Sequence, residues 1–227
     1  MTEIAPEPQV AVVAALRAAI IRGDYAPRQR LVESELCEDF NTSRFIVRNA
    51  LQELSADGLV EFQRNRGARV REISLTEAIE ITQVRRLLEG YEAAQAARLV
   101  TNEQKRTLRK IVKNMRAAVE VADPLRYSDL NAQLHAMIQE IADNKTCARV
   151  LRQLRDQTIR HSFSLSLVPG RARVSLPQHE AIAAALIAQD PQAAEQAMLR
   201  HLDSVLEAFQ VLSAGLGQVG QVPAGRR

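Results

Sequence analysis

Apolar residues recur every three or four positions in three stretches near the start of the chain, which is the spacing of one face of an α-helix. This pattern predicts helices over residues 10–22, 33–40 and 44–56. The polar run Asn41-Thr42-Ser43 separates the second helix from the third and contains residues that commonly cap helix starts. Gly58 follows the third helix, where glycine often ends one.

Two short segments with β character come next, at 59–63 and 68–73. They are joined by Arg64-Asn65-Arg66-Gly67, in which the glycine supplies the turn of a hairpin. Three helices followed by a basic hairpin form the arrangement of a winged helix-turn-helix.

From residue 74 onward the periodicity and the capping signals predict only helices. The predicted helices cover 76–99, 102–121, 124–142, 144–162, 175–189 and 191–213. The helix-start signals are Ser74 with Glu77, Thr101 with Gln104, Asp123-Pro124, Ser175 with Gln178, and Asp190-Pro191. Residues 163–174 are predicted to be a loop around Pro169-Gly170. The expected fold is therefore mostly α, with a winged helix-turn-helix at 1–74, an antiparallel all-α bundle at 75–214 and a flexible tail at 215–227.

Composition agrees with a mostly helical protein that does not span a membrane. The chain is 46% hydrophobic and 4% aromatic, lacks Trp, and has no apolar run near the roughly 18–20 residues of a membrane span. Its first residues are acidic and proline-rich, unlike a secretory signal. The two cysteines, Cys37 and Cys147, are far apart and favour reduced thiols in a cytoplasmic protein.

Positive charge is concentrated around the third predicted helix and the hairpin, although the net charge of the chain is only +3. Arg44 and Arg48 lie one helical turn apart, away from the apolar face of helix 44–56. A major groove about 12 Å wide admits one helix, and arginine forms paired hydrogen bonds to guanine or phosphate. The alternative is that Arg44 and Arg48 simply belong to a solvated helix face. The complete series of three helices and a basic hairpin favours the DNA-binding interpretation over this one.

Several motifs in this region resemble the DNA-binding domain of GntR-family bacterial regulators. The motifs are Ile21-Arg22-Gly23-Asp24-Tyr25, Leu31-Val32-Glu33-Ser34-Glu35-Leu36, Ser43-Arg44-Phe45-Ile46-Val47-Arg48-Asn49-Ala50-Leu51, Asp57-Gly58-Leu59-Val60 and Asn65-Arg66-Gly67-Ala68. The resemblance implies contacts to duplex DNA from Ser34, Thr42, Ser43, Arg44, Arg48, Asn65, Arg66 and Gly67. The chain departs from the family at Pro27-Arg28, Phe45-Ile46 and Arg48-Asn49-Ala50, which implies an altered base preference.

Three of the four histidines fall in separate predicted helices of the second part. Asn131 precedes His135 by one helical turn, so the two side chains share a face, while His179 and His201 lie far along the chain. If they converge, three imidazoles and an amide oxygen could bind a divalent ion such as Zn²⁺ or Ni²⁺ and leave positions open for a ligand. Three unrelated histidines are the alternative from the residues alone.

This second part is similar to the FCD effector domain of the FadR subgroup of GntR regulators. That pattern has an Asp or Asn four residues before a His, a His near the start of a later helix and a last His on the final helix, which Asn131, His135, His179 and His201 match. Asn in place of Asp removes a negative charge, which should weaken metal affinity. On the first helix Arg85 shares an apolar face and should be buried, where it needs an anion. A bound carboxylate effector or an internal partner, Glu89 or Glu92, could supply it.

These features predict a transcription regulator, read as a repressor, rather than an enzyme. It would be a homodimer that binds a pseudo-palindromic operator of double-stranded DNA and responds to a small organic acid. One rival function is a metal-dependent hydrolase with Glu180 or Glu140 as base, although the chain has no HExxH, phosphate-loop or nucleophile-elbow motif. The other is a regulator for which the metal itself is the signal.

Overall fold

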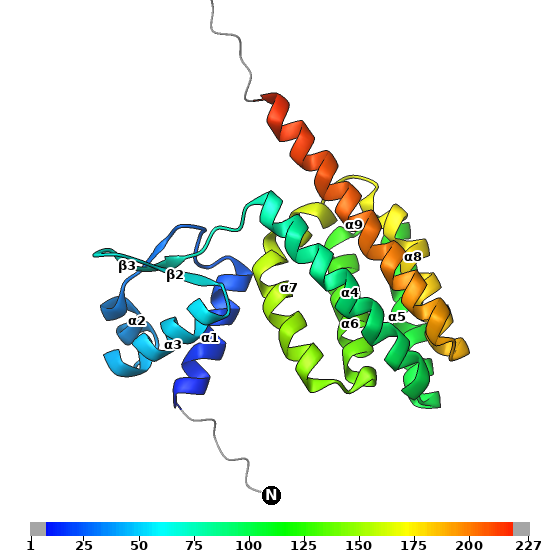
Figure 1. The fold of residues 1–227 in the computed structure, drawn as a ribbon, viewed down its shortest axis with the longest axis horizontal. Helices are drawn as coiled ribbons and strands as arrows, with labels where there is room; N and C mark the ends of the chain where they lie inside the picture. The colour runs from blue at the N-terminus through cyan, green and yellow to red at the C-terminus, as the bar shows by residue number, and fades with distance from the viewer. Residues whose placement is uncertain (1–7, 220–227) are drawn as a thin grey trace, which may run out of the picture. The chain divides into compact units, whose positions relative to one another are not determined.

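The computed structural model describes residues 8–219, and the chain folds into two compact units (Figure 1). The N-terminal unit ends at Ile73 and the C-terminal unit begins at Ser74. None of the helices in the described part of the chain combines the length and apolar character that a bilayer span requires.

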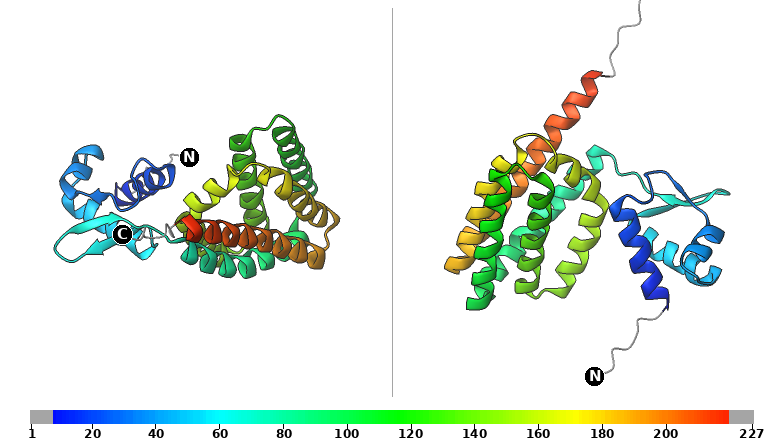
Figure 2. Two further views of the ribbon diagram at one scale, coloured as in Figure 1. Left: turned by 90° about the horizontal axis from the view of Figure 1, so that it is seen from above. Right: turned by 180° about the vertical axis from the view of Figure 1, so that it is seen from behind.

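The N-terminal unit contains three helices and a small antiparallel sheet. Its elements are α1 (Pro8–Arg22), β1 (Arg30–Leu31), α2 (Glu33–Asp39), α3 (Arg44–Ala56), β2 (Val60–Gln63) and β3 (Gly67–Val70). The sheet has the order β1-β3-β2, and the β2–β3 hairpin extends beyond the helices (Figures 1 and 2). Leu16, Leu36 and Leu51 form the centre of its core. The predicted mostly α fold with a wing is confirmed.

The strand β1 was not predicted from the sequence. It has only two residues, with Arg30 opposite Arg69 and Leu31 opposite Ala68. Two residues are too few to show the alternation that identifies a strand. The pairing places buried Leu31 against the hairpin and connects α1 and α2 to the wing.

The C-terminal unit is an all-α bundle. Its helices are α4 (Leu75–Leu99), α5 (Asn102–Glu120), α6 (Pro124–Ala142), α7 (Lys145–Ser166), α8 (Arg171–Ala188) and α9 (Pro191–Val219). Figures 1 and 2 show α4 and α9 side by side along much of their length. They approach closely at Gly90, where an added Cβ would lie 2.9 Å from Leu199 Cδ2.

Most of the predicted helix starts are confirmed by their capping contacts. The Ser74 hydroxyl accepts the Glu77 amide at 3.1 Å, and Thr101 and Gln104 form a reciprocal capping box. The carboxylates of Asp123 and Asp190 accept the amides of Arg126 and Ala193 at 3.0 and 2.9 Å. Each contact satisfies an amide that the helix itself leaves without a partner.

The predicted loop at 163–174 and the predicted helix start at Ser175 are wrong. The helix α7 continues to Ser166, α8 begins at Arg171, and the intervening turn ends at Gly170, whose φ is 83°. Ser175 is buried inside α8, and its hydroxyl donates to the Arg171 carbonyl at 2.7 Å. Ser175 and Gln178 have the spacing of a capping box, but the same spacing also occurs between residues inside a helix, as it does here.

The last helix is longer than predicted, since α9 extends to Val219 rather than ending at residue 213. The predicted flexible tail at 215–227 therefore overlaps helix up to Val219, and its remaining residues, 220–227, lie outside the described residues.

Candidate functional site

The helix α3 has one face buried and one face exposed. Its start is held by Ser43, whose hydroxyl accepts the Ile46 amide at 3.4 Å. The turn before it is closed by the Thr42 amide, which donates to the Cys37 carbonyl at 3.0 Å. The buried face consists of Val47, Ala50, Leu51 and Leu54. Arg44 is exposed at the first position of the helix, as predicted.

Arg48 is also exposed, but it has a partner that the sequence did not indicate. Its Nη2 lies 3.2 Å from Glu33 Oε2, and its Nε lies 3.3 Å from Glu33 Oε1. Such an exposed ion pair contributes little to stability. It holds the guanidinium over α2 and would have to open for Arg48 to bond to a base or a phosphate.

The hairpin turn presents its basic residues to solvent. The Gln63 carbonyl accepts the Arg66 amide at 3.0 Å, and Asn65 has a left-handed φ of 62°. Arg64, Asn65 and Arg66 are exposed. A surface hollow brings Ser34 of α2 together with Arg44 of α3 and Gly67 at the start of β3. Residues that were predicted from separate motifs therefore share one face of this unit.

The three histidines of the bundle do converge. His135 of α6, His179 of α8 and His201 of α9 are buried, and one nitrogen from each lies within 4.8 Å of those from the others. The ring centroids of His179 and His201 are 4.3 Å apart, and that of His135 lies 5.8 and 5.5 Å from them. The fourth histidine, His161, lies outside this histidine cluster and has its ring against Phe209.

Each ring of the histidine cluster is oriented by a polar partner at Nδ1. His135 Nδ1 lies 2.8 Å from Glu89 Oε2, and His201 Nδ1 lies 3.1 Å from Gln178 Oε1. His179 Nδ1 lies 2.8 Å from the Tyr127 hydroxyl. Partners at one ring nitrogen determine which nitrogen carries the proton and direct the other toward a metal. The nitrogen left for coordination is therefore Nε2 in all three rings.

Two buried polar atoms at this cluster have no partner in the structure: His179 Nε2 and Asn131 Oδ1. Burial lowers the pKa of all three imidazoles, and repulsion between the rings lowers the pKa of His179 and His201 further. Neutral rings keep the lone pair that a metal requires. Three nitrogens and an amide oxygen form a donor set that fits Zn²⁺ or Ni²⁺.

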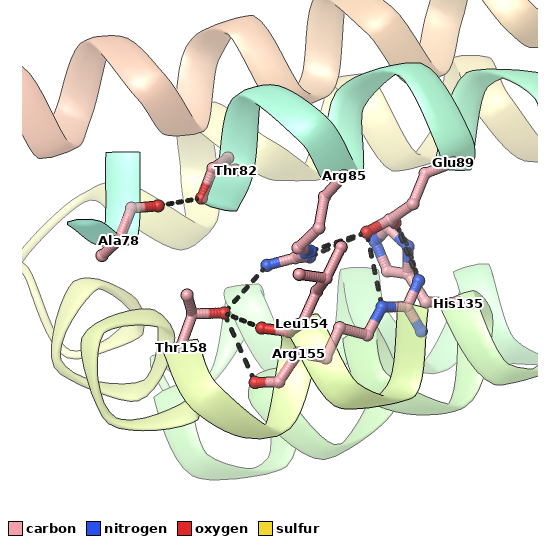
Figure 3. A network of polar contacts seen from close by, with 8 residues as sticks. All are labelled: Ala78, Thr82, Arg85, Glu89, His135, Leu154, Arg155 and Thr158. Carbon is pink, nitrogen blue, oxygen red and sulfur yellow. Dashed lines mark hydrogen bonds and ion pairs between the residues drawn. The ribbon is translucent and has the colours of Figure 1, made fainter. Parts of the chain in front are cut away.

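A buried charge network adjoins the histidine cluster (Figure 3). Glu89 of α4 is 1% exposed and accepts from Arg85 Nε at 2.9 Å and from Arg155 Nη2 at 2.8 Å. Burial alone would raise the pKa of Glu89, but the guanidiniums of Arg155 and Arg85 outweigh it and hold this pKa well below its usual range. The side chain of Arg85 is largely buried, in agreement with the prediction, with 12% of it exposed, and Glu89 is its internal partner.

A cavity of about 200 Å³ opens beside the histidine cluster. The three histidines and Asn131 line it together with three guanidiniums, those of Arg85, Arg155 and Arg171. No acidic side chain of the described residues lines it. Two arginines share the single carboxylate of Glu89, so the walls carry excess positive charge. Arg171 was not identified from the sequence, because residues 163–174 were predicted to be a loop, whereas in the structure Arg171 begins α8, the helix that carries His179.

The two glutamates considered as a hydrolytic base do not line this cavity. Glu180 follows His179 on α8, but its carboxylate accepts from Arg116 Nη2 of α5 at 2.6 Å. Glu140 is exposed on α6. A base must lie within hydrogen-bonding reach of the reacting water, and neither carboxylate has this position.

Comparisons with known proteins agree with the two-unit organisation. Residues 8–70 match the model of bacterial regulatory proteins of the gntR family, and residues 80–204 match that of the FCD domain. The chain belongs to the GntR family of bacterial regulators. Its FCD domain assigns it to the FadR-like subfamily, and its relatives are transcriptional regulators and not enzymes.

This GntR-family regulator has relatives of similar length in Escherichia coli. It is 28% identical over 195 residues to the HTH-type transcriptional repressor RspR, with 86% of each chain covered. It is 28% identical over 218 residues to the galactonate operon transcriptional repressor, covering 85% of this chain and 93% of the other. The structure of E. coli McbR/YncC shares the fold, with a TM-score of 0.76 and 19% identity over 92% of this chain and all of that one.

Proposed function

We propose that this GntR-family regulator is a repressor whose operator affinity is set by a small organic acid bound in the metal-containing cavity of its FCD domain. The observation that carries the proposal is the cavity itself, where the histidine cluster and Arg171 line the same space. RspR and the galactonate regulator are named repressors, which supports the sign of regulation. A bacterial protein that acts on operator DNA works in the cytoplasm.

The histidine cluster and Asn131 would hold the metal, through Nε2 of each ring and the amide oxygen. A bound Zn²⁺ or Ni²⁺ would act as a Lewis acid and provide open positions for an oxygen ligand. The three rings are held in position by contacts at Nδ1 from Glu89, Tyr127 and Gln178. With three neutral rings and an amide, the donor set adds no negative charge, so an anionic ligand is favoured.

Arg171 is the group best placed to select a carboxylate. Its guanidinium is part-buried, and its Nη1 donates to the main-chain and hydroxyl oxygens of Ser204 at 3.2 and 3.1 Å. Both oxygens are neutral, whereas Arg85 and Arg155 already bond to Glu89. A buried guanidinium without a bonded anion gains more from a bound carboxylate than one that is already paired. Arg85 would contribute from the cavity wall.

Arg171→Gln is expected to abolish the thermal stabilisation by organic acids while leaving metal binding intact. The measurement is a thermal-shift screen of small mono- and dicarboxylates and sugar acids on metal-loaded protein, with bound metal counted by elemental analysis. Sugar acids belong in the screen because one relative is named for galactonate. Arg173→Gln is the matched control, since Arg173 is exposed and does not line this cavity.

An acid that stabilises the wild type and Arg171→Gln equally would remove Arg171 from the proposed site. An acid that still binds after the metal has been chelated would contradict a role for the metal in holding it.

Two copies of the chain are needed to read a pseudo-palindromic operator, and we propose that they meet through α4. Val84, Leu87 and Tyr91 are spaced by three and four residues, and are 49%, 66% and 45% exposed. This spacing places them in one stripe along the helix. Exposed apolar stripes mark protein interfaces, and a twofold axis would place each stripe against its copy.

Leu87→Glu is therefore expected to convert the dimer to a monomer and to weaken operator binding by at least tenfold. Two buried carboxylates would face each other across the axis at a cost of several kcal/mol. Size-exclusion chromatography with light scattering measures the mass. Gln133→Glu adds the same charge at an exposed site on α6 and should leave the dimer intact. A dimeric Leu87→Glu protein would refute this interface.

A further inference from the structure

Phe45 is an exposed aromatic side chain that does not pack against the core of the N-terminal unit. It is 72% exposed, whereas its neighbour Ile46 packs against the core of the N-terminal unit. Phenylalanine buries about 150–250 Å² when it lies in a core or an interface. Phe45 is the most exposed phenylalanine of the described residues, since Phe62 and Phe163 are 48% and 45% exposed. Phe45 does not belong to the hydrophobic cluster of this unit, and its exposure therefore has no structural explanation within the described residues.

The position of Phe45 on α3 directs it away from the protein. At about 100° per residue, it lies opposite the buried face formed by Val47, Leu51 and their neighbours. It occupies the first turn of the helix, next to Arg44 and on the same exposed side as Arg48. The first turn of a recognition helix is the part that meets base edges in the major groove.

In the major groove, the apolar group on a base edge is the C5-methyl group of thymine. An apolar ring at the position of Phe45 is suited to contact this methyl group. We propose that Phe45 is a specificity-determining residue that contacts a thymine methyl in each half of the operator. The proposal rests on the DNA-binding role of α3 and adds a base preference to it. Arginines on either side would contact guanine or phosphate, while Phe45 distinguishes thymine from cytosine.

The test begins with selection of duplexes from a randomised library by the full-length wild-type protein. Each thymine of the selected duplex is then replaced in turn by uracil, which removes only the methyl group and keeps the hydrogen-bonding pattern. We expect one thymine in each half-site at which this change weakens wild-type binding. The loss should be roughly fourfold, because that is the contribution of one buried methyl group. Phe45→Ala should bind the thymine and uracil duplexes equally.

Two controls separate the contact from general effects. Phe45→Leu keeps an apolar side chain and should retain part of the preference for thymine. Phe163→Ala removes an exposed phenyl ring from α7 in the other unit and should respond to uracil as the wild type does. Circular dichroism and thermal unfolding should be unchanged in all three variants, because neither ring is part of a core.

Two results would overturn the proposal: a wild-type protein that is insensitive to every uracil substitution, or a Phe45→Ala protein as sensitive as the wild type. A Phe45→Ala protein that loses affinity for all duplexes alike would show contact with the sugar-phosphate backbone and also contradict it. Failure of the wild type to select any duplex would instead contradict the DNA-binding role of this unit.

Discussion

Glu89→Gln is expected to lower the free energy of unfolding of the C-terminal unit by about 3–5 kcal/mol. The carboxylate is 1% exposed and balances Arg85 and Arg155 while accepting from His135 (Figure 3). An amide keeps the shape of the side chain but leaves two largely buried guanidiniums, 12% and 22% exposed, without an anion. Removing one member of a buried ion pair is costly because the remaining charge stays desolvated. Urea unfolding followed by circular dichroism measures the change.

The matched control is Asp203→Asn, which breaks the pair between Asp203 and Arg86, also on α4. This pair is partly exposed, with side chains 44% and 31% accessible, so its loss should cost less than about 1 kcal/mol. Equal losses for the two variants would contradict the account of Glu89 as the centre of a buried network. Glu89→Gln should also weaken metal binding about 10- to 100-fold, because Glu89 orients His135.

Adding Zn²⁺ or Ni²⁺ to metal-free protein is expected to stabilise it by about 4 kcal/mol when the free metal exceeds its dissociation constant a thousandfold. The three rings are close together, and their lowered pKa values favour the neutral form, so an ion would bind the folded state with little rearrangement. His179→Ala and His201→Ala should remove this stabilisation and the bound metal together. Thermal unfolding with and without a chelator, combined with elemental analysis, measures both effects.

His161→Ala is the control for this series, because His161 lies outside the histidine cluster and beside Phe209. It should bind metal as the wild type does. Metal retained at full stoichiometry by both His179→Ala and His201→Ala would show that the cluster is a set of packed rings and not a metal centre.

Local signals in the sequence predicted much of the fold. The helix α3 has the predicted bounds, Arg44–Ala56, because its apolar face repeats regularly and Ser43 caps its start. The wrong predictions of secondary structure occurred where the local sequence pattern is compatible with more than one conformation. Ser175 resembled a helix cap yet bonds to a carbonyl inside α8. The two-residue strand β1 depends on its partner β3 and has no pattern of its own.

The candidate site was predictable in part. Periodicity predicted that Arg85 is buried, which agrees with its side chain being only 12% exposed, and the resemblance to FCD domains identified Asn131 and the three histidines as a set. The sequence named Glu89 as one of two possible partners for Arg85 but gave no sign of Arg155, which comes from another helix 66 residues away. Contacts between distant helices depend on how the bundle packs, and no spacing along one helix encodes them.

The most direct test of the account is the affinity of the full-length protein for its selected operator duplex, measured by fluorescence anisotropy while an organic acid is titrated. The acid is the one that gives the largest thermal shift with metal-loaded protein. In metal-loaded protein the acid should change operator affinity by about 5- to 150-fold, which corresponds to a coupling free energy of about 1–3 kcal/mol. After the metal is removed, the acid should leave operator affinity unchanged. Operator affinity that is the same with and without the acid, or that responds equally without the metal, would contradict this account.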